Sequence, residues 1–302
     1  MKTLITLIRR ELWEHRALWF VPLMIGALMI GLSIVASVFN NNANIQIHLD
    51  GKATEFLAGL NEDKSVRNFG WGIGGIFALQ LMVMLIVLGN YVLDTLYSER
   101  KDRSILFWKS MPVSDGMTVA SKVATALLVV PLWVYAVSLL TGVLCYAVLA
   151  LRFAGTPLAA VASWDTGTFL KLQSEFLGHT LIASLWYAPV VAALLVISAW
   201  ARRSPWVWAT VPIWVAYLVE KIAFGTHYIT SFVAYRLTYF FSGPKYSGDS
   251  ATSIHAASEA QKLVMELNVT PLLFNVDLWL GVVAAAGLMY VAVRLRRYRD
   301  DT

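Results

Sequence analysis

The chain has 302 residues, of which 58% are hydrophobic and only 14% are charged, and its formal net charge is +5. Soluble globular domains carry about 25% charged residues, so this composition excludes an ordinary soluble domain and indicates an integral membrane protein. A single cysteine, Cys145, excludes an intrachain disulfide and a cysteine-based metal site. The basic residues gather in separate loops, and the positive net charge therefore does not indicate nucleic-acid binding.

The first 16 residues, MKTLITLIRRELWEHR, carry apolar residues at helical spacing. Leu4, Leu7, Ile8 and Leu12 fall along one stripe, which Trp13 extends less regularly. This stripe predicts an amphipathic helix over residues 1–16 that lies at the inner membrane interface. The apolar run that follows is longer than the core of a secretory signal, so we expect an anchor and not a cleaved leader.

Six apolar runs then predict membrane-spanning helices, which need about 20 apolar residues each. The runs are continuous and not alternating, so the expected fold is an all-α integral membrane protein without strands. The fifth run is the least regular, because Pro212 should kink it and because Glu220 and Lys221 near its end must snorkel to the interface. The predicted spans are residues 17–39, 71–93, 123–151, 181–200, 206–224 and 278–293.

Most Lys and Arg residues lie in the amino end, the 94–122 connection, the turn after the fourth span and the carboxyl end. The positive-inside rule therefore predicts that both termini are cytoplasmic. We expect a multi-pass protein of a bacterial-type cytoplasmic membrane. The whole chain, 1–302, is expected to form one membrane domain. Its last outer loop contains an aromatic run, HYITSFVAYRLTYFF, which suits a short helix dipping into the outer leaflet. The predicted extracytoplasmic loops are 40–70, 152–180 and 225–275.

The predicted spans contain no Asp, Glu, Lys or Arg except Glu220 and Lys221 at the edge of the fifth. Ion-coupled carriers place titratable groups at mid-depth, so an ion-driven carrier is not favoured. The sequence lacks the HExxH, GxSxG and phosphate-loop motifs, and its five histidines are dispersed. We therefore expect no catalytic, cofactor-binding or metal site in this chain, and any transport against a gradient must draw its energy from a separate protein.

The connection 94–122 has the most charged stretch of the chain, SERKDR, followed by bulky apolar residues. Mixed charges beside Ile105, Phe107 and Trp108 are typical of a protein-docking surface, in which bulky anchors are surrounded by a polar rim. Basic residues that only contact lipid headgroups are the alternative. The presence of Glu99 and Asp102 fits that alternative less well.

The motif YSERKDRSILFWKSMPVSD and the later Lys122, together with six spans and an amphipathic amino helix, resemble the permease subunit of ABC type-2 exporters. A weaker likeness covers NVTPLLFNVDLWLG before the last span. The resemblance implies a cytoplasmic coupling helix between spans two and three. It also implies docking of a separate ATP-binding subunit, which binds the ATP and Mg²⁺, and pairing with a second copy or a sister permease. The implied coupling-helix docking residues are Glu99, Arg100, Asp102, Arg103, Ile105, Phe107, Trp108 and Pro112, with weaker support for Arg9, Arg10, Glu11 and Trp13 on the amphipathic helix.

We therefore expect the membrane subunit of an ATP-driven exporter that forms half of a translocation pathway, and not an enzyme. The charge-poor spans favour an amphipathic cargo such as a peptide, an antibiotic or a lipid-like molecule. The alternative is a membrane sensor or assembly module that recruits a cytoplasmic partner without transporting anything. The sequence leaves open the cargo, the direction of transport and the choice between a homodimer and a heterodimer.

Overall fold

The computed structural model describes residues 2–39, 62–105, 110, 112–153, 166–238 and 273–298. Within these ranges the regular elements are all helices, and no strand occurs. Six helices among them are long and apolar enough to cross a membrane. The predictions of an all-α fold and of six helices long and apolar enough to span a membrane are thereby confirmed. The apolar stretches that qualify as spans are Ala17–Val35, Ala78–Lys101, Asp115–Arg152, Gln173–Trp200, Pro205–Phe224 and Val276–Tyr298.

The helices extend beyond several of the predicted limits. The helix of the third span begins at Asp115, well before its predicted start at residue 123, and Lys122 therefore lies inside this helix. A π turn, Thr125–Val129, interrupts the same helix. The elements are α1 (Lys2–Glu14), α2 (Ala17–Phe39), α4 (Glu62–Lys101), α6 (Asp115–Ala124), α7 (Val130–Phe153), α8 (Thr166–Trp200), α9 (Pro205–Val219), α10 (Tyr228–Thr238) and α14 (Val276–Tyr298).

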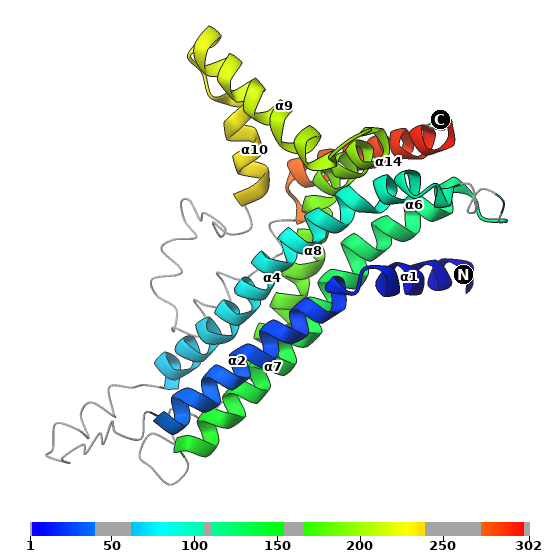
Figure 1. The fold of residues 1–302 in the computed structure, drawn as a ribbon. Helices are drawn as coiled ribbons and strands as arrows, with labels where there is room; N and C mark the ends of the chain where they lie inside the picture. Colours follow the sequence, from blue (N-terminus) through cyan, green and yellow to red (C-terminus); the bar gives the residue numbers. More distant parts are fainter. Residues whose placement is uncertain are drawn as a thin grey trace, which may run out of the picture.

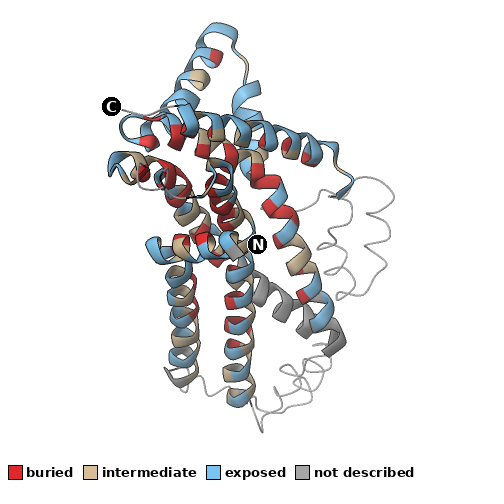
Figure 2. Cartoon of the chain, turned by 90° about the vertical axis from the view of Figure 1, so that its right-hand side faces the viewer, coloured by how far each residue is buried: buried red, intermediate tan, exposed pale blue. Residues whose placement is uncertain are grey.

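Helices α2, α4, α7 and α8 form the bundle, and α14 packs along α8 (Figure 1). Buried positions lie where helices face one another, and exposed positions lie on the outward faces (Figure 2). Ala188 and Ala192 of α8 meet Ala285 of α14, and these small side chains allow the two helices to approach closely. The main apolar core consists of Leu18, Met84, Tyr91, Val92, Leu96, Ala126, Val130, Val134, Val191, Leu195, Ala199 and Ala292.

Helix α1, the described parts of the 94–122 connection and the carboxyl end of α14 lie toward one end of the bundle, which we call the terminal end (Figure 1). An even number of spans places both ends of the chain on one side of a membrane, in agreement with this arrangement. Helix α1 turns into α2 at His15 and Arg16, and it packs one face against α6. Leu7 and Glu11 lie on this buried face, whereas Ile5 and Trp13 are exposed.

Helix α9 leans away from the bundle, and α10 turns back from it toward α8 (Figure 1). The turn passes through a π turn, Glu220–Phe224, and through Gly225, whose φ of 62° is easily adopted by glycine. Glu220 was predicted to snorkel, but its buried carboxylate caps α10 instead. It accepts hydrogen bonds from the backbone N–H of Ile229 (3.0 Å) and of Tyr228, and from the Thr226 hydroxyl (3.1 Å). Helix α10 lies within the aromatic run for which a short helix was predicted.

Candidate functional site

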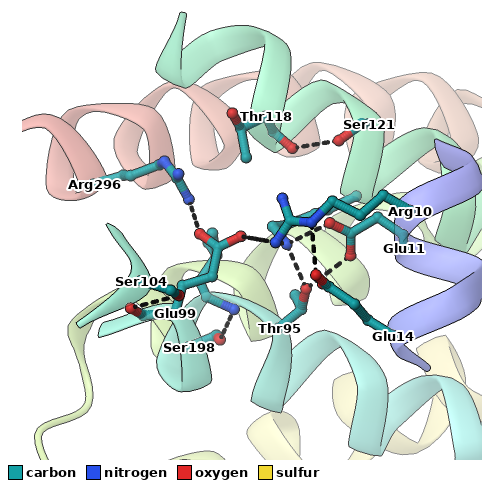
Figure 3. A network of polar contacts seen from close by, with 12 residues as sticks. Arg10, Glu11, Glu14, Thr95, Glu99, Ser104, Thr118, Ser121, Ser198 and Arg296 are labelled. Atoms are coloured by element: carbon teal, nitrogen blue, oxygen red, sulfur yellow. Dashed lines mark hydrogen bonds and ion pairs between the residues drawn. The ribbon is translucent and has the colours of Figure 1, made fainter. Parts of the chain in front are cut away.

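A buried network of ion pairs joins α1, α4, α6 and α14 at the terminal end (Figure 3). Lys122 of α6 lies at its centre and is 1% exposed. Its ammonium nitrogen is 2.8 Å from Oε1 of Glu11 and 3.0 Å from Oε1 of Glu99. It also donates to the hydroxyl of Thr95, at 2.7 Å. One lysine therefore links the amino-terminal helix to the end of α4.

The second cation of the network is Arg296, near the carboxyl end of α14. Its guanidinium donates to Oε2 of Glu99 and, through Nε, to Oδ1 of Asp115 at 3.1 Å. Arg10 approaches the opposite oxygen of Glu99 at 3.8 Å and pairs with Glu14 at 2.6 Å. Glu99 thus faces cations from three helices, α1, α6 and α14.

The buried charges of this network balance one another. Glu11, Glu99, Lys122 and Arg296 are each at most 5% exposed, and their formal charges sum to zero. The remaining oxygen of Glu11 accepts hydrogen bonds from the Tyr91 hydroxyl (3.0 Å) and the Thr95 hydroxyl (3.2 Å). A buried charge is tolerated only when it is paired and hydrogen-bonded, so these contacts offset the cost of removing four charges from water.

Local sequence signals place the α6 residues of the network. Ser114 caps the helix by accepting a hydrogen bond from the backbone N–H of Met117 at 3.2 Å, and Asp115 adds a negative charge to the first turn. Lys122 lies two turns later on the buried face. The π turn that begins at Thr125 contains one extra residue, which rotates the face of the following helix by about 100°. Helix α6 can thereby face the charges while α7 faces the apolar core.

Arg100 and Ser198 fasten the end of α4 to the end of α8. The Arg100 guanidinium donates to the backbone carbonyls of Ser198 (2.7 Å) and Ala201 (2.8 Å), where α8 ends. These carbonyls have no partner within the helix, so a cation there is favourable. In return, the Ser198 hydroxyl accepts from the backbone N–H of Leu96 (3.2 Å) and Tyr97 (3.1 Å).

The residues predicted to dock a partner separate into three groups in the structure. Glu99, Arg100 and Glu11 are engaged in contacts within the chain, Ile105 is buried, and Arg10 is half-buried in the network. These contacts hold the helices together, and a docking role for the same residues stays a prediction. A second group is exposed, with three residues in the connection and two on the outer face of α1. Phe107 and Trp108 lie outside the described residues, as does most of the predicted coupling helix. The exposed group consists of Asp102, Arg103, Pro112, Arg9 and Trp13.

The backbone explains why exposure changes so abruptly after Glu99. Helix α4 ends at Lys101, and Arg103 adopts a left-handed conformation with φ 56°. Its N–H donates to the carbonyl of Arg100 at 3.1 Å, which closes the last turn. Residues up to Arg100 therefore pack with the bundle, whereas Asp102 and Arg103 project beyond it.

Sequence reasoning did not identify the network partners Lys122, Arg296 and Asp115 as a site. In the sequence, Lys122 stood out only as part of a motif, and Arg296 stood out only as one of several basic residues at the carboxyl end. One signal was present, because Glu11 follows Leu4 and Leu7 along the apolar stripe of α1. A carboxylate on a buried helical face requires a cation from another helix.

The chemistry of this site is ion pairing between helices. Among the described residues no group of three or more His, Cys, Asp or Glu side chains could hold a metal ion. Comparison with protein-family models, with curated proteins and with solved structures finds no match to this chain. The functional conclusion therefore depends on the geometry and on the motif resemblance.

Proposed function

We propose that this chain is the membrane subunit of an ATP-driven exporter of the ABC type-2 kind, and that it docks a separate ATP-binding subunit at its terminal end. The observation that carries the proposal is the anchoring of the 94–122 connection on both sides. Glu99 precedes the exposed residues Asp102 and Arg103, and Asp115 and Lys122 follow them in the chain. Glu99, Asp115 and Lys122 are joined through Arg296 and Glu11 to two further helices.

Such anchoring suits a segment that transmits force. A partner that displaces the exposed residues Asp102 and Arg103 would move the ends of α4 and α6 together, because Lys122 bridges them. The same contacts extend to α1 through Glu11 and to α14 through Arg296. A loose loop would absorb the displacement, whereas packed and ion-paired helix ends pass it to the bundle.

The exposed charges of the connection suit a polar docking rim. Asp102 and Arg103 offer opposite charges, and Arg9 lies over the ring of Trp13 at 5.2 Å on the outer face of α1. Arginine and tryptophan are enriched among the residues that dominate binding energies. ATP and Mg²⁺ would be bound by the partner, and a second copy or a sister permease would complete the pathway.

The test is co-expression of the chain with any ATP-binding subunit encoded next to it, followed by purification and measurement of ATP hydrolysis in proteoliposomes. The variants are Asp102→Asn and Arg103→Asn, since asparagine tolerates the left-handed backbone at position 103. Arg203→Asn is the matched control, because Arg203 is also exposed and lies in the turn between α8 and α9.

We expect the double variant of Asp102 and Arg103 to weaken association with the ATPase about tenfold, as the loss of one or two rim contacts would. The control should bind like the parent chain. The proposal fails if no ATP-binding subunit co-purifies, or if the double variant and the control bind equally well. A stable complex without ATP-dependent movement of any amphipathic cargo would support the recruiting module instead.

A further inference from the structure

A cavity of about 620 Å³ opens between the α1–α2 corner, α4 and the start of α9. Its size lies within the range of small-molecule sites. The cavity lies at the terminal end of the spans, because α2 begins at Ala17 and α9 at Pro205, and both residues line it. It therefore opens at the depth where the apolar part of a bilayer gives way to headgroups.

The walls of this cavity are divided by polarity. Glu14, His15, Arg16 and Asp94 supply polar groups, and apolar side chains such as Leu18 and Val87 line the remainder. A molecule that fits both parts must have a charged head and an apolar tail.

The acidic groups determine the sign of the head. Asp94 is exposed and makes no ion pair within the part of the chain that the structure describes. Glu14 forms an ion pair with Arg10, in which Oε1 of Glu14 lies 2.6 Å from Nε of Arg10. His15 adds no positive charge at neutral pH, because burial lowers its pKa and outweighs the opposing effect of Glu11. With Glu14 paired to Arg10, Asp94 is the carboxylate that remains in the polar wall to receive a cationic head, and Arg16 is the one arginine among the residues that line the cavity.

Aromatic groups complete the site. Trp206 is the second residue of α9, and its indole N–H donates to Oδ1 of Asn90 at 3.1 Å, which holds the ring at the cavity wall. Tyr91 packs edge-to-face against His15, with ring centroids 4.8 Å apart. Aromatic rings beside carboxylates are the surroundings that recognise ammonium groups.

We propose that this cavity binds an ammonium-bearing amphiphile from the leaflet at the terminal end, with the ammonium beside Asp94 and the tail along Leu18, Val87 and Trp206. The binding site stands independently of the proposed export function. The ammonium can come from a bilayer lipid, such as phosphatidylethanolamine, or from a free cationic amphiphile.

The experiment is photolabelling of the full-length chain in dodecyl maltoside micelles with an alkyl-trimethylammonium probe that carries a diazirine. Labelled peptides are mapped by mass spectrometry. We expect labelling to concentrate on residues 14–18, 87–94 and 205–206. Asp94→Asn should reduce it about tenfold at subsaturating probe, as the loss of one charge-assisted contact would.

Asp102→Asn is the matched control, because Asp102 is an exposed carboxylate outside the cavity, and it should label like the parent chain. Thermal unfolding checks that both variants fold. Short-chain phosphatidylethanolamine and phosphatidylglycerol are then added as competitors. Competition by the ethanolamine lipid identifies a bilayer lipid as a source, and competition only by cationic amphiphiles identifies a free molecule. The proposal is overturned if phosphatidylglycerol competes equally, if labelling spreads over all apolar faces, or if Asp94→Asn has no effect.

Discussion

Lys122→Met should be among the most destabilising single substitutions in this chain. Methionine fills a similar volume but removes the cation that lies 2.8 Å from Glu11 and 3.0 Å from Glu99. Glu99 keeps Arg296, so one buried carboxylate, Glu11, loses its nearest partner. An uncompensated buried charge costs about 3–5 kcal/mol, and the lost hydrogen bond to Thr95 adds about 1 kcal/mol. We therefore expect the free energy of unfolding to fall by about 4–6 kcal/mol.

The measurement is unfolding in mixed dodecyl maltoside–SDS micelles, followed by circular dichroism. The decisive comparison adds Glu11→Gln to Lys122→Met. The amide removes the unpaired charge and keeps an oxygen that can accept from the Tyr91 hydroxyl. The double variant should recover more than half of the loss. The reasoning is refuted if Lys122→Met costs less than about 1 kcal/mol, a value typical of exposed ion pairs, or if the double variant is no more stable than the single one.

Three further predictions concern other buried or half-buried positions. Gln80 is buried, and neither its side-chain nitrogen nor its side-chain oxygen has a hydrogen-bond partner among the described residues. Gln80→Leu should therefore raise the free energy of unfolding by about 1–2 kcal/mol in the same SDS assay. A lower free energy of unfolding would show that the amide is used. At Gly26, an added Cβ would lie 2.6 Å from Oγ1 of Thr141. Gly26→Ala should therefore lower the free energy of unfolding by about 1–3 kcal/mol, and adding Thr141→Ala should restore it. If the second substitution restores nothing, the clash is not the cause. Burial holds the pKa of His15 below its ordinary 6.5, so the unfolded state binds more protons than the folded state as the pH falls below that value. The SDS concentration at the unfolding midpoint should therefore fall as the pH drops from 7.5 to 5. A His15→Asn variant should lose this part of the pH dependence, and a variant with the same pH profile as the parent chain would contradict the prediction.

The helical elements could largely be predicted from the sequence, because hydropathy and helical spacing are local properties. The first predicted span, 17–39, coincides with α2, and α10 lies in the aromatic run for which a short helix was expected. The amphipathic stripe before the first span likewise corresponds to α1. In each case a single segment must hide its own backbone and apolar side chains, and its composition suffices to indicate how.

The roles of the charged residues could not be predicted in the same way. Glu99 and Asp102 look alike in SERKDR, yet one is buried in the network and the other lies beyond the end of α4. Glu220 looked like an interfacial charge and proved to be the cap of another helix.

The sequence by itself determined that this chain is an all-α membrane protein with six candidate spans and a charged connection, because each property depends on neighbouring residues. Only the tertiary structure decided which charges are buried and paired. Lys122 meets a carboxylate 111 positions away on α1, and Arg296 meets one 197 positions away on α4. Such pairings arise from how the helix ends pack together, and a buried charge finds its partner through space and not along the chain.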